Sequence, residues 1–170
     1  MKTKHVHRGF TLIEALVYLV LFAIVIGGAI VSSYGIFDSI GRNETKAMLQ
    51  EEGDFLVAKI NWMLSGVQSV DVPAVGSHGP TLSTTKWDTS IVSPVKLTVN
   101  ALGLMEISRG GNPAQLLAND NVSVTDLDFK HEFAGGTGPE SVKTMFTLSA
   151  RTPRGQVMTE DFTTTSYIRK

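Results

Sequence analysis

The chain has 170 residues, a length that suits one domain of ordinary size with an additional segment. Its 15 Lys plus Arg nearly balance its 16 Asp plus Glu, so the composition indicates no strongly basic face and gives no signal for a nucleic-acid partner. The absence of cysteine excludes disulfides, thiolate metal sites and cysteine nucleophiles.

The first nine residues, "MKTKHVHRG", form a short basic leader with no acidic residue. Lys2, Lys4 and Arg8 precede an apolar segment, and positively charged flanks of membrane helices stay in the cytoplasm. The charge pattern therefore predicts a cytoplasmic N-terminus and a C-terminal bulk on the outer side. His5 and His7 have a spacing that a metal site could use, but we interpret them as part of a flexible basic tail.

The next segment is a long apolar run, Ala15–Phe37, with 23 residues and no charge between Glu14 and Asp38. A helix of this length covers ~35 Å, which is enough to cross the apolar core of a bilayer. A secretory signal peptide fits poorly, because its apolar core is shorter and is followed, not preceded, by small residues. We therefore expect a membrane-inserted helix, with Tyr34 close to the outer interface.

The helical pattern continues after the apolar run. Apolar residues recur with steps of 7, 4, 3 and 4, as in the stripe of an amphipathic helix, at Leu49, Leu56, Ile60, Met63 and Val67. Core packing suffices to explain Trp62, which neighbours this stripe. Ser65-Gly66 is expected to begin the end of the helix and Pro73 to complete it. The pattern predicts one helix from about Phe10 to about Val67, weakened locally by its glycines.

Beyond Pro73 the chain has recurrent turn signals with short β-prone runs between them. Residues 95–100 and 102–108 are predicted to pair around a turn. Residues 122–133 and 142–151 flank a glycine-rich loop, and residues 156–168 form a last strand. In the run 142–151, strict alternation places five side chains on one face: Val142, Thr144, Phe146, Leu148 and Ala150.

The predicted fold class is α+β, because a sheet and an amphipathic helix each have to bury one apolar face. The last three strands are expected to form an antiparallel meander that covers the helix. The predicted divisions are a leader (1–9), a membrane and assembly helix (10–37), an amphipathic half of that helix (38–72) and a β-rich globular domain (73–170). Within that domain, the loops 103–121 and 134–140 are the expected places for specificity.

Candidate chemical sites are few. His78 and His131 are expected to be surface or turn residues without partners. The runs "NDN" (119–121) and "DLD" (126–128) offer oxygen ligands for calcium, but they lack the glycine and the distal Glu of a complete loop motif, and we interpret them as turn and strand-edge residues. The segments "RGGNP" and "AGGTGPE" are interpreted as hairpin loops. No nucleotide-binding, hydrolase or zinc motif stands in its proper context, so we expect no enzyme, cofactor or metal.

One short motif is specific. In "RGFTLIE", residues 8–14, a basic residue and Gly9 precede Phe10, and Glu14 follows five positions after the glycine. Together with the leader and the apolar helix, this motif resembles the processing site of type IV pilins and pseudopilins. The resemblance implies that a prepilin peptidase cuts after Gly9 and that Phe10 becomes an N-methylated N-terminus. It also implies that Glu14 meets the N-terminal ammonium of a neighbouring subunit.

A physical argument supports that role for Glu14. An ionisable group inside a membrane is unfavourable by ~2.5–3.5 kcal/mol on insertion scales, and a close opposite charge offsets the cost in an apolar filament core. The pair would therefore favour one stagger between subunits. The alternative interpretation is that Glu14 is a helix-start residue favoured by the helix dipole.

The resemblance is strong over residues 8–37 and only architectural beyond them. Val31 stands where many major pilins have a proline, although Gly27-Gly28 could weaken the helix instead, and the cysteine pair of many major pilins is missing. Both departures favour a minor pilin or a pseudopilin. The C-terminal strands are loosely similar to those of minor pilin-like proteins of the larger pseudopilin type.

The implied function is that of a structural subunit in a filament for motility, adhesion, DNA uptake or type II protein secretion. The implied partners are prepilin peptidase, other pilin or pseudopilin subunits, the inner-membrane assembly platform and, before assembly, membrane lipid. The implied location is the cytoplasmic membrane and then a surface pilus or periplasmic pseudopilus. The alternatives are a pilus-mounted adhesin or DNA-capture module and a membrane-anchored enzyme, the last without motif support.

Overall fold

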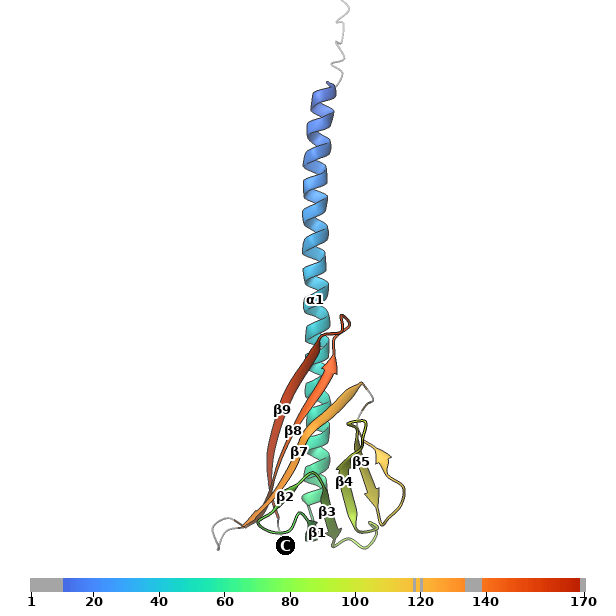
Figure 1. Cartoon of the computed structure of the whole chain (residues 1–170), viewed down its shortest axis with the longest axis vertical. Coiled ribbons are helices and arrows are strands. Elements are labelled where there is room, and N and C mark those ends of the chain that lie inside the picture. The colour runs from blue at the N-terminus through green and yellow to red at the C-terminus, as the bar shows by residue number, and fades with distance from the viewer. Residues whose placement is uncertain (1–10, 118, 120, 134–138, 169–170) are drawn as a thin grey trace, which may run out of the picture. The chain divides into compact units, whose positions relative to one another are not determined.

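The structure, a computed structural model, describes residues 11–117, 119, 121–133 and 139–168. Contacts between residues divide the chain into two units, Met1–Gly41 and Arg42–Lys170. One long helix precedes a set of antiparallel strands, which confirms the predicted α+β class (Figure 1).

Helix α1 extends from Leu12 to Leu64 and contributes to both units. It ends directly before Ser65-Gly66, where Gly66 adopts a left-handed backbone conformation with φ of 59°. A glycine in this conformation is the common C-terminal cap of helices, because it lacks a Cβ atom. The helix therefore ends before Val67, which is buried as the first residue of a strand, so its place in the helical spacing was a coincidence.

Within the second unit, α1 buries one stripe of side chains, as its spacing predicts. The members of this stripe are Thr45, Leu49, Gly53, Leu56, Ile60, Met63 and Leu64. Glycine is part of the stripe and does not interrupt the helix. Steps of three and four residues place the first six of these on one side of the helix, and Leu64 directly follows Met63, so the amphipathic half has one buried face.

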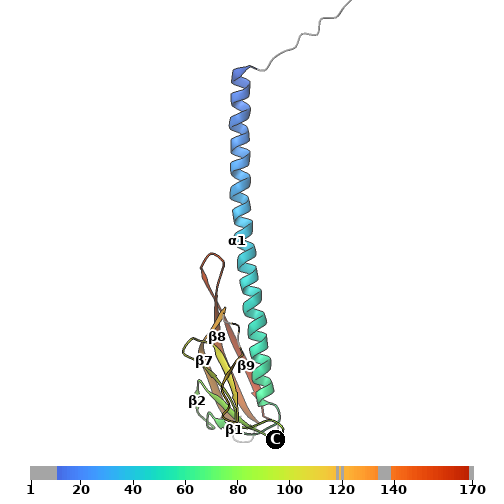
Figure 2. The ribbon, with the colours of Figure 1, turned by 90° about the vertical axis from the view of Figure 1, so that its right-hand side faces the viewer.

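The strands form two antiparallel sheets (Figure 1). The first has the order β1-β3-β4-β5-β6, with bounds Val67–Val72, Leu82–Lys86, Val95–Val99, Met105–Arg109 and Gln115–Leu116. The second has the order β2-β7-β8-β9, with bounds His78–Gly79, Val122–Phe133, Glu140–Arg151 and Val157–Tyr167. Figure 2 shows β7, β8 and β9 beside the C-terminal part of α1.

The expected hairpin of β4 and β5 and the expected meander of β7, β8 and β9 are both present. The segment "RGGNP" connects β5 to β6, as a hairpin loop should. Strands β1 and β3 were not predicted. Together with the hairpin of β4 and β5 they belong to a sheet that is distinct from the sheet of β7, β8 and β9. Strand β1 lies where the sequence suggested the tail of the helix, and β3, "LSTTK", has too few apolar residues to show an apolar alternation.

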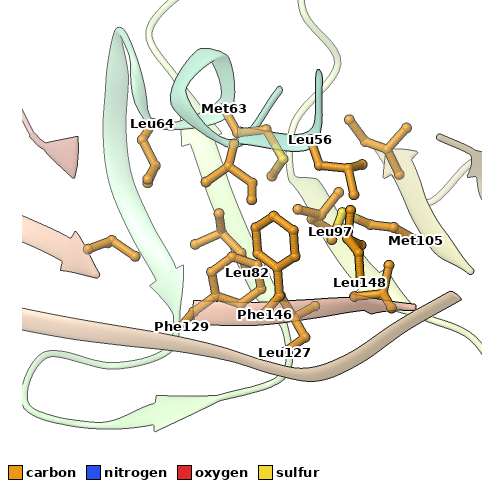
Figure 3. Close-up of a cluster of buried hydrophobic side chains, with 14 of the residues drawn as sticks. Leu56, Met63, Leu64, Leu82, Leu97, Met105, Leu127, Phe129, Phe146 and Leu148 are labelled. Atoms are coloured by element: carbon orange, nitrogen blue, oxygen red, sulfur yellow. The ribbon is translucent and has the colours of Figure 1, made fainter. Parts of the chain in front are cut away.

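The core lies between α1 and the inner faces of both sheets. Figure 3 shows Leu56 and Met63 of α1 pointing toward Leu82 and Leu97 of the first sheet and Phe146 of the second. All five residues predicted to share one face of β8 are buried, which confirms the alternation in that strand. Each fully buried large aliphatic or aromatic side chain stabilises the fold by ~1.5–3 kcal/mol, so this cluster is the main source of cohesion.

Candidate processing and assembly site

The first described residue, Thr11, caps the start of α1. The backbone N–H of Glu14 donates to the Thr11 hydroxyl at 3.4 Å and to the Thr11 carbonyl at 3.1 Å. Thr and Glu at this spacing have the sequence pattern of a capping box, in which a side chain satisfies a backbone donor that the first turn leaves without a partner. Gly9 and Phe10, like His5 and His7, lie outside the described residues.

Glu14 lies in the first turn of α1 and is exposed. At this end of a helix the partial positive charge of the dipole stabilises a carboxylate, as the helix-start interpretation requires. The assembly interpretation concerns a second subunit, and it stays a prediction. The two interpretations are compatible, because the dipole acts on the carboxylate within one subunit, whereas the amine of the assembly interpretation would belong to a neighbour.

The surface of α1 that follows Glu14 is apolar and exposed. Large hydrophobic side chains remain more than 40% exposed along this segment, among them Leu19 at 70% and Val31 at 73%. An 18-residue window has a mean hydropathy of 2.6 and no buried residue, so by length and composition the helix is able to cross a membrane. An apolar surface of this size requires lipid or other apolar helices as its surroundings.

This surface is not uniform. Small side chains at Ala29 and Ser33 form the floor of a shallow hollow between larger neighbours, which are Ile26, Ile30, Tyr34 and Phe37. The Ser33 hydroxyl donates to the Ala29 carbonyl at 2.9 Å. The Ser33 hydroxyl is therefore satisfied within the helix, which suits an apolar environment.

Residues 4–30 match the family model of the prokaryotic N-terminal methylation motif. The chain carries a prepilin-type signal. This prepilin signal includes the junction of Gly9 and Phe10, Glu14, and the apolar helix as far as Ile30. It implies processing by prepilin peptidase and assembly with other pilins, and proteins with this motif are structural rather than catalytic. No curated protein and no solved structure matches the chain significantly.

The two isolated histidines both have partners, contrary to the sequence-based expectation. His131 is 1% exposed; its Nδ1 donates to the Pro73 carbonyl at 2.8 Å, and its Nε2 lies 2.7 Å from Glu140 Oε1. His78 is at the surface, as expected, but its Nδ1 lies 2.9 Å from Asp128 Oδ1. Sequence reasoning missed these contacts because each joins residues at least nine positions apart, and the His131–Pro73 contact spans 58 positions.

The two runs considered for calcium have other roles in the structure. Asn119 and Asn121 lie around a turn, where the Asn121 backbone N–H donates to Asn119 Oδ1 at 3.2 Å. Asp126 has a φ of 52° at a register shift in β7, and Asp128 contacts His78. Among the described residues, no group of three or more His, Cys, Asp and Glu side chains is placed to hold a metal ion.

Proposed function

We propose that this chain is a minor pilin or pseudopilin, a structural subunit that is cut after Gly9 and assembled through α1. The observation that carries the proposal is the methylation motif at residues 4–30, continued by an exposed apolar helix with Glu14 in its first turn. A plain membrane anchor needs the helix, but it needs neither the junction of Gly9 and Phe10 nor a carboxylate close to it.

The proposed mechanism begins with cleavage on the cytoplasmic face, which creates an ammonium group at Phe10. The leader carries Lys2, Lys4 and Arg8, so its removal leaves 12 of the 15 basic residues against 16 acidic ones, a net charge of −4 before the new amine is counted. In the filament, Glu14 of one subunit pairs with the Phe10 amine of a neighbour. The pair offsets the cost of placing the carboxylate in an apolar surrounding and favours one register.

Cleavage is tested by a substitution at the junction. Gly9→Ala should leave the full-length precursor in membranes of cells that contain prepilin peptidase, whereas the unaltered chain should begin at an N-methylated Phe10. Mass spectrometry of the N-terminal peptide distinguishes the two. An unaltered chain that retains Met1 in cells with active peptidase would overturn the proposal.

Assembly is tested separately at Glu14. Glu14→Ala should be cleaved normally, but the amount of it found in filaments should fall at least about tenfold. The reason is that an unpaired ammonium in an apolar core costs more than about 1.4 kcal/mol, which corresponds to a factor of ten. Glu14→Asp is the matched control, because it keeps the charge with a shorter reach and should retain part of the incorporation. Full incorporation of Glu14→Ala, measured on sheared filaments, would exclude the charge-pairing role.

A further inference from the structure

The second unit contains a cluster of three cations around one aromatic ring. The Lys59 and Lys86 Nζ atoms each lie 4.9 Å from the centroid of the Trp62 ring, and the Arg109 guanidinium carbon lies 5.4 Å from it. From the sequence, Trp62 was expected to need only core packing. It does pack partly buried against the core, and it also gathers these three charges.

Two sheet strands and the last turns of α1 create this cluster. Lys86 shares a face of β3 with the buried Leu82 and Thr84, and Val95 pairs with both Thr84 and Arg109 across the first sheet. Alternation therefore directs Lys86 and Arg109 to the α1 side of that sheet, at the same end. Lys59 precedes Trp62 by three residues, which places the two on one face of the helix.

Lys86 is held firmly in this position. Lys86 is only 6% exposed. Its Nζ donates a hydrogen bond to the Trp62 carbonyl at 2.7 Å and another to the Ser65 carbonyl. These carbonyls belong to the C-terminal end of α1, where the partial negative charge of the dipole favours a cation. An ammonium has three hydrogens, so one donor remains beyond these two bonds.

Within the described part of the chain, no carboxylate forms an ion pair with this cluster of Lys59, Lys86 and Arg109. The carboxylate of Asp88, two residues beyond Lys86, accepts the Ser90 backbone N–H at 2.9 Å, and hydrogen bonds from Ser90 hold the pKa of Asp88 below its usual value. Burial lowers the pKa of the Lys86 ammonium.

The electrostatic attraction between a cation and an aromatic face needs only one cation on that face. A ring has two faces, so at least two of the three cations share one of them and repel each other. An anion between them removes the repulsion, and the indole excludes water on one side, which strengthens the attraction. The Arg109 guanidinium offers a planar fork for two oxygens, and a lysine adds a point charge, a combination that suits a carboxylate or a phosphate.

We propose that Lys59, Trp62, Lys86 and Arg109 form a binding site for an oxyanion. The anion is either the carboxylate of an acidic side chain on another subunit or a free phosphate or sulfate. The first source rests on the proposed role as a filament subunit, whereas the second does not.

The test is a fluorescence titration of the cleaved full chain in uncharged detergent micelles. Trp62 and Trp87 are the two tryptophans of the chain, and Trp87 is 61% exposed, so Trp87→Phe leaves Trp62 as the reporter. Sodium phosphate and a tetraglutamate peptide are added at constant ionic strength. We expect a saturable change in Trp62 emission with at least one of them, weaker at higher salt. Tighter binding of the peptide would indicate an acidic side chain, and tighter binding of phosphate a free anion.

Variants decide whether the response comes from this site. Lys59→Gln and Arg109→Gln should each raise the half-saturation concentration about tenfold, the loss expected for one charge-assisted hydrogen bond. The matched control is Lys96→Gln, because Lys96 is exposed on β4 beside the buried Val95 and Leu97, on the opposite face of the same sheet. Circular dichroism melting verifies that each variant is folded. No saturable response to either anion, or an unchanged response in the Lys59→Gln/Arg109→Gln double variant, would overturn the proposal.

Discussion

At Gly53, helix α1 lies against the Phe162 ring of β9. A Cβ atom added there would lie 2.0 Å from Cζ of Phe162, whose ring stacks on Phe146 with centroids 5.2 Å apart. Because the Phe162 ring is held by this stacking, it has little freedom to move away. The sequence suggested a weak point of the helix, whereas the structure shows a contact that only glycine allows.

Gly53→Ala should therefore destabilise the protein by ~1–3 kcal/mol, the usual cost of overpacking, although alanine is the better helix former. Gly35→Ala is the matched control, since nothing lies within 4 Å of the added Cβ, and it should cost nothing. Urea unfolding in micelles measures both, with a probe in the second unit. Equal stability of the two variants would contradict the role of Gly53.

Lys86 gives a second prediction at the residue scale, in the form of a pH dependence. Burial lowers its pKa in the folded protein below the unfolded value of about 10.4. The unfolded chain then binds the proton more tightly, so this group makes the fold more stable as pH rises from the lowered pKa toward about 10.4. Two hydrogens of the neutral amine still serve the Trp62 and Ser65 carbonyls.

The measurement is the free energy of unfolding between pH 7 and pH 10 for the unaltered chain and for Lys86→Met. As pH rises, the free energy of unfolding of the unaltered chain should increase relative to that of Lys86→Met. The other titrating groups contribute equally to both chains, so they cancel in this difference. A difference that is constant, or that shifts the other way, would show that burial does not control the protonation of Lys86.

At the scale of elements, β8 carries two threonines with opposite surroundings. Thr144 is fully buried, and its hydroxyl has no hydrogen-bond partner within the part of the chain that the structure describes. Thr147, three residues later on the outer face, donates its hydroxyl to Asp161 Oδ1 on β9 at 2.7 Å. The same residue type therefore has an unfavourable polar atom in one place and a satisfied one in the other.

Thr144→Val should stabilise the protein by ~1 kcal/mol, because it replaces a buried polar atom without a partner by a methyl group of similar size. Thr147→Val should be neutral or destabilising by up to ~1 kcal/mol, because it removes a partnered hydroxyl. Thermal unfolding of the two variants under one set of conditions measures this. A loss of stability in Thr144→Val would indicate that its hydroxyl has a partner, such as a bound water.

At the scale of the whole molecule, the buried hydrophobic core belongs to the second unit alone. Every buried hydrophobic residue of the described chain lies at Leu49 or beyond it, whereas the apolar residues between Leu12 and Phe37 are exposed. The two parts of α1 thus suit different surroundings. The first presents an apolar surface that suits an apolar medium, and the second packs within a folded domain.

A fragment that begins at Arg42 should therefore fold cooperatively in water without detergent. A fragment that begins at Asp54 is the matched comparison, since it loses Leu49 and the contact of Gly53 with Phe162, and it should be less stable by at least ~3 kcal/mol. Circular dichroism and urea unfolding report both. Failure of the longer fragment to fold would mean that the first part of α1 contributes to the stability of the domain.

The sequence by itself determined the features that depend on neighbouring residues or on a regular period. These are the processing motif, the apolar run, the buried stripe of α1 and the long strands β7, β8 and β9. The tertiary structure decided the features that depend on residues far apart in the chain. Strand pairing brings Val67 opposite Lys86 and Val95 opposite Arg109, and only this pairing buries Lys86 and gathers three cations at Trp62. Periodicity reports which face of an element is buried, whereas pairing across sheets decides which side chains meet there.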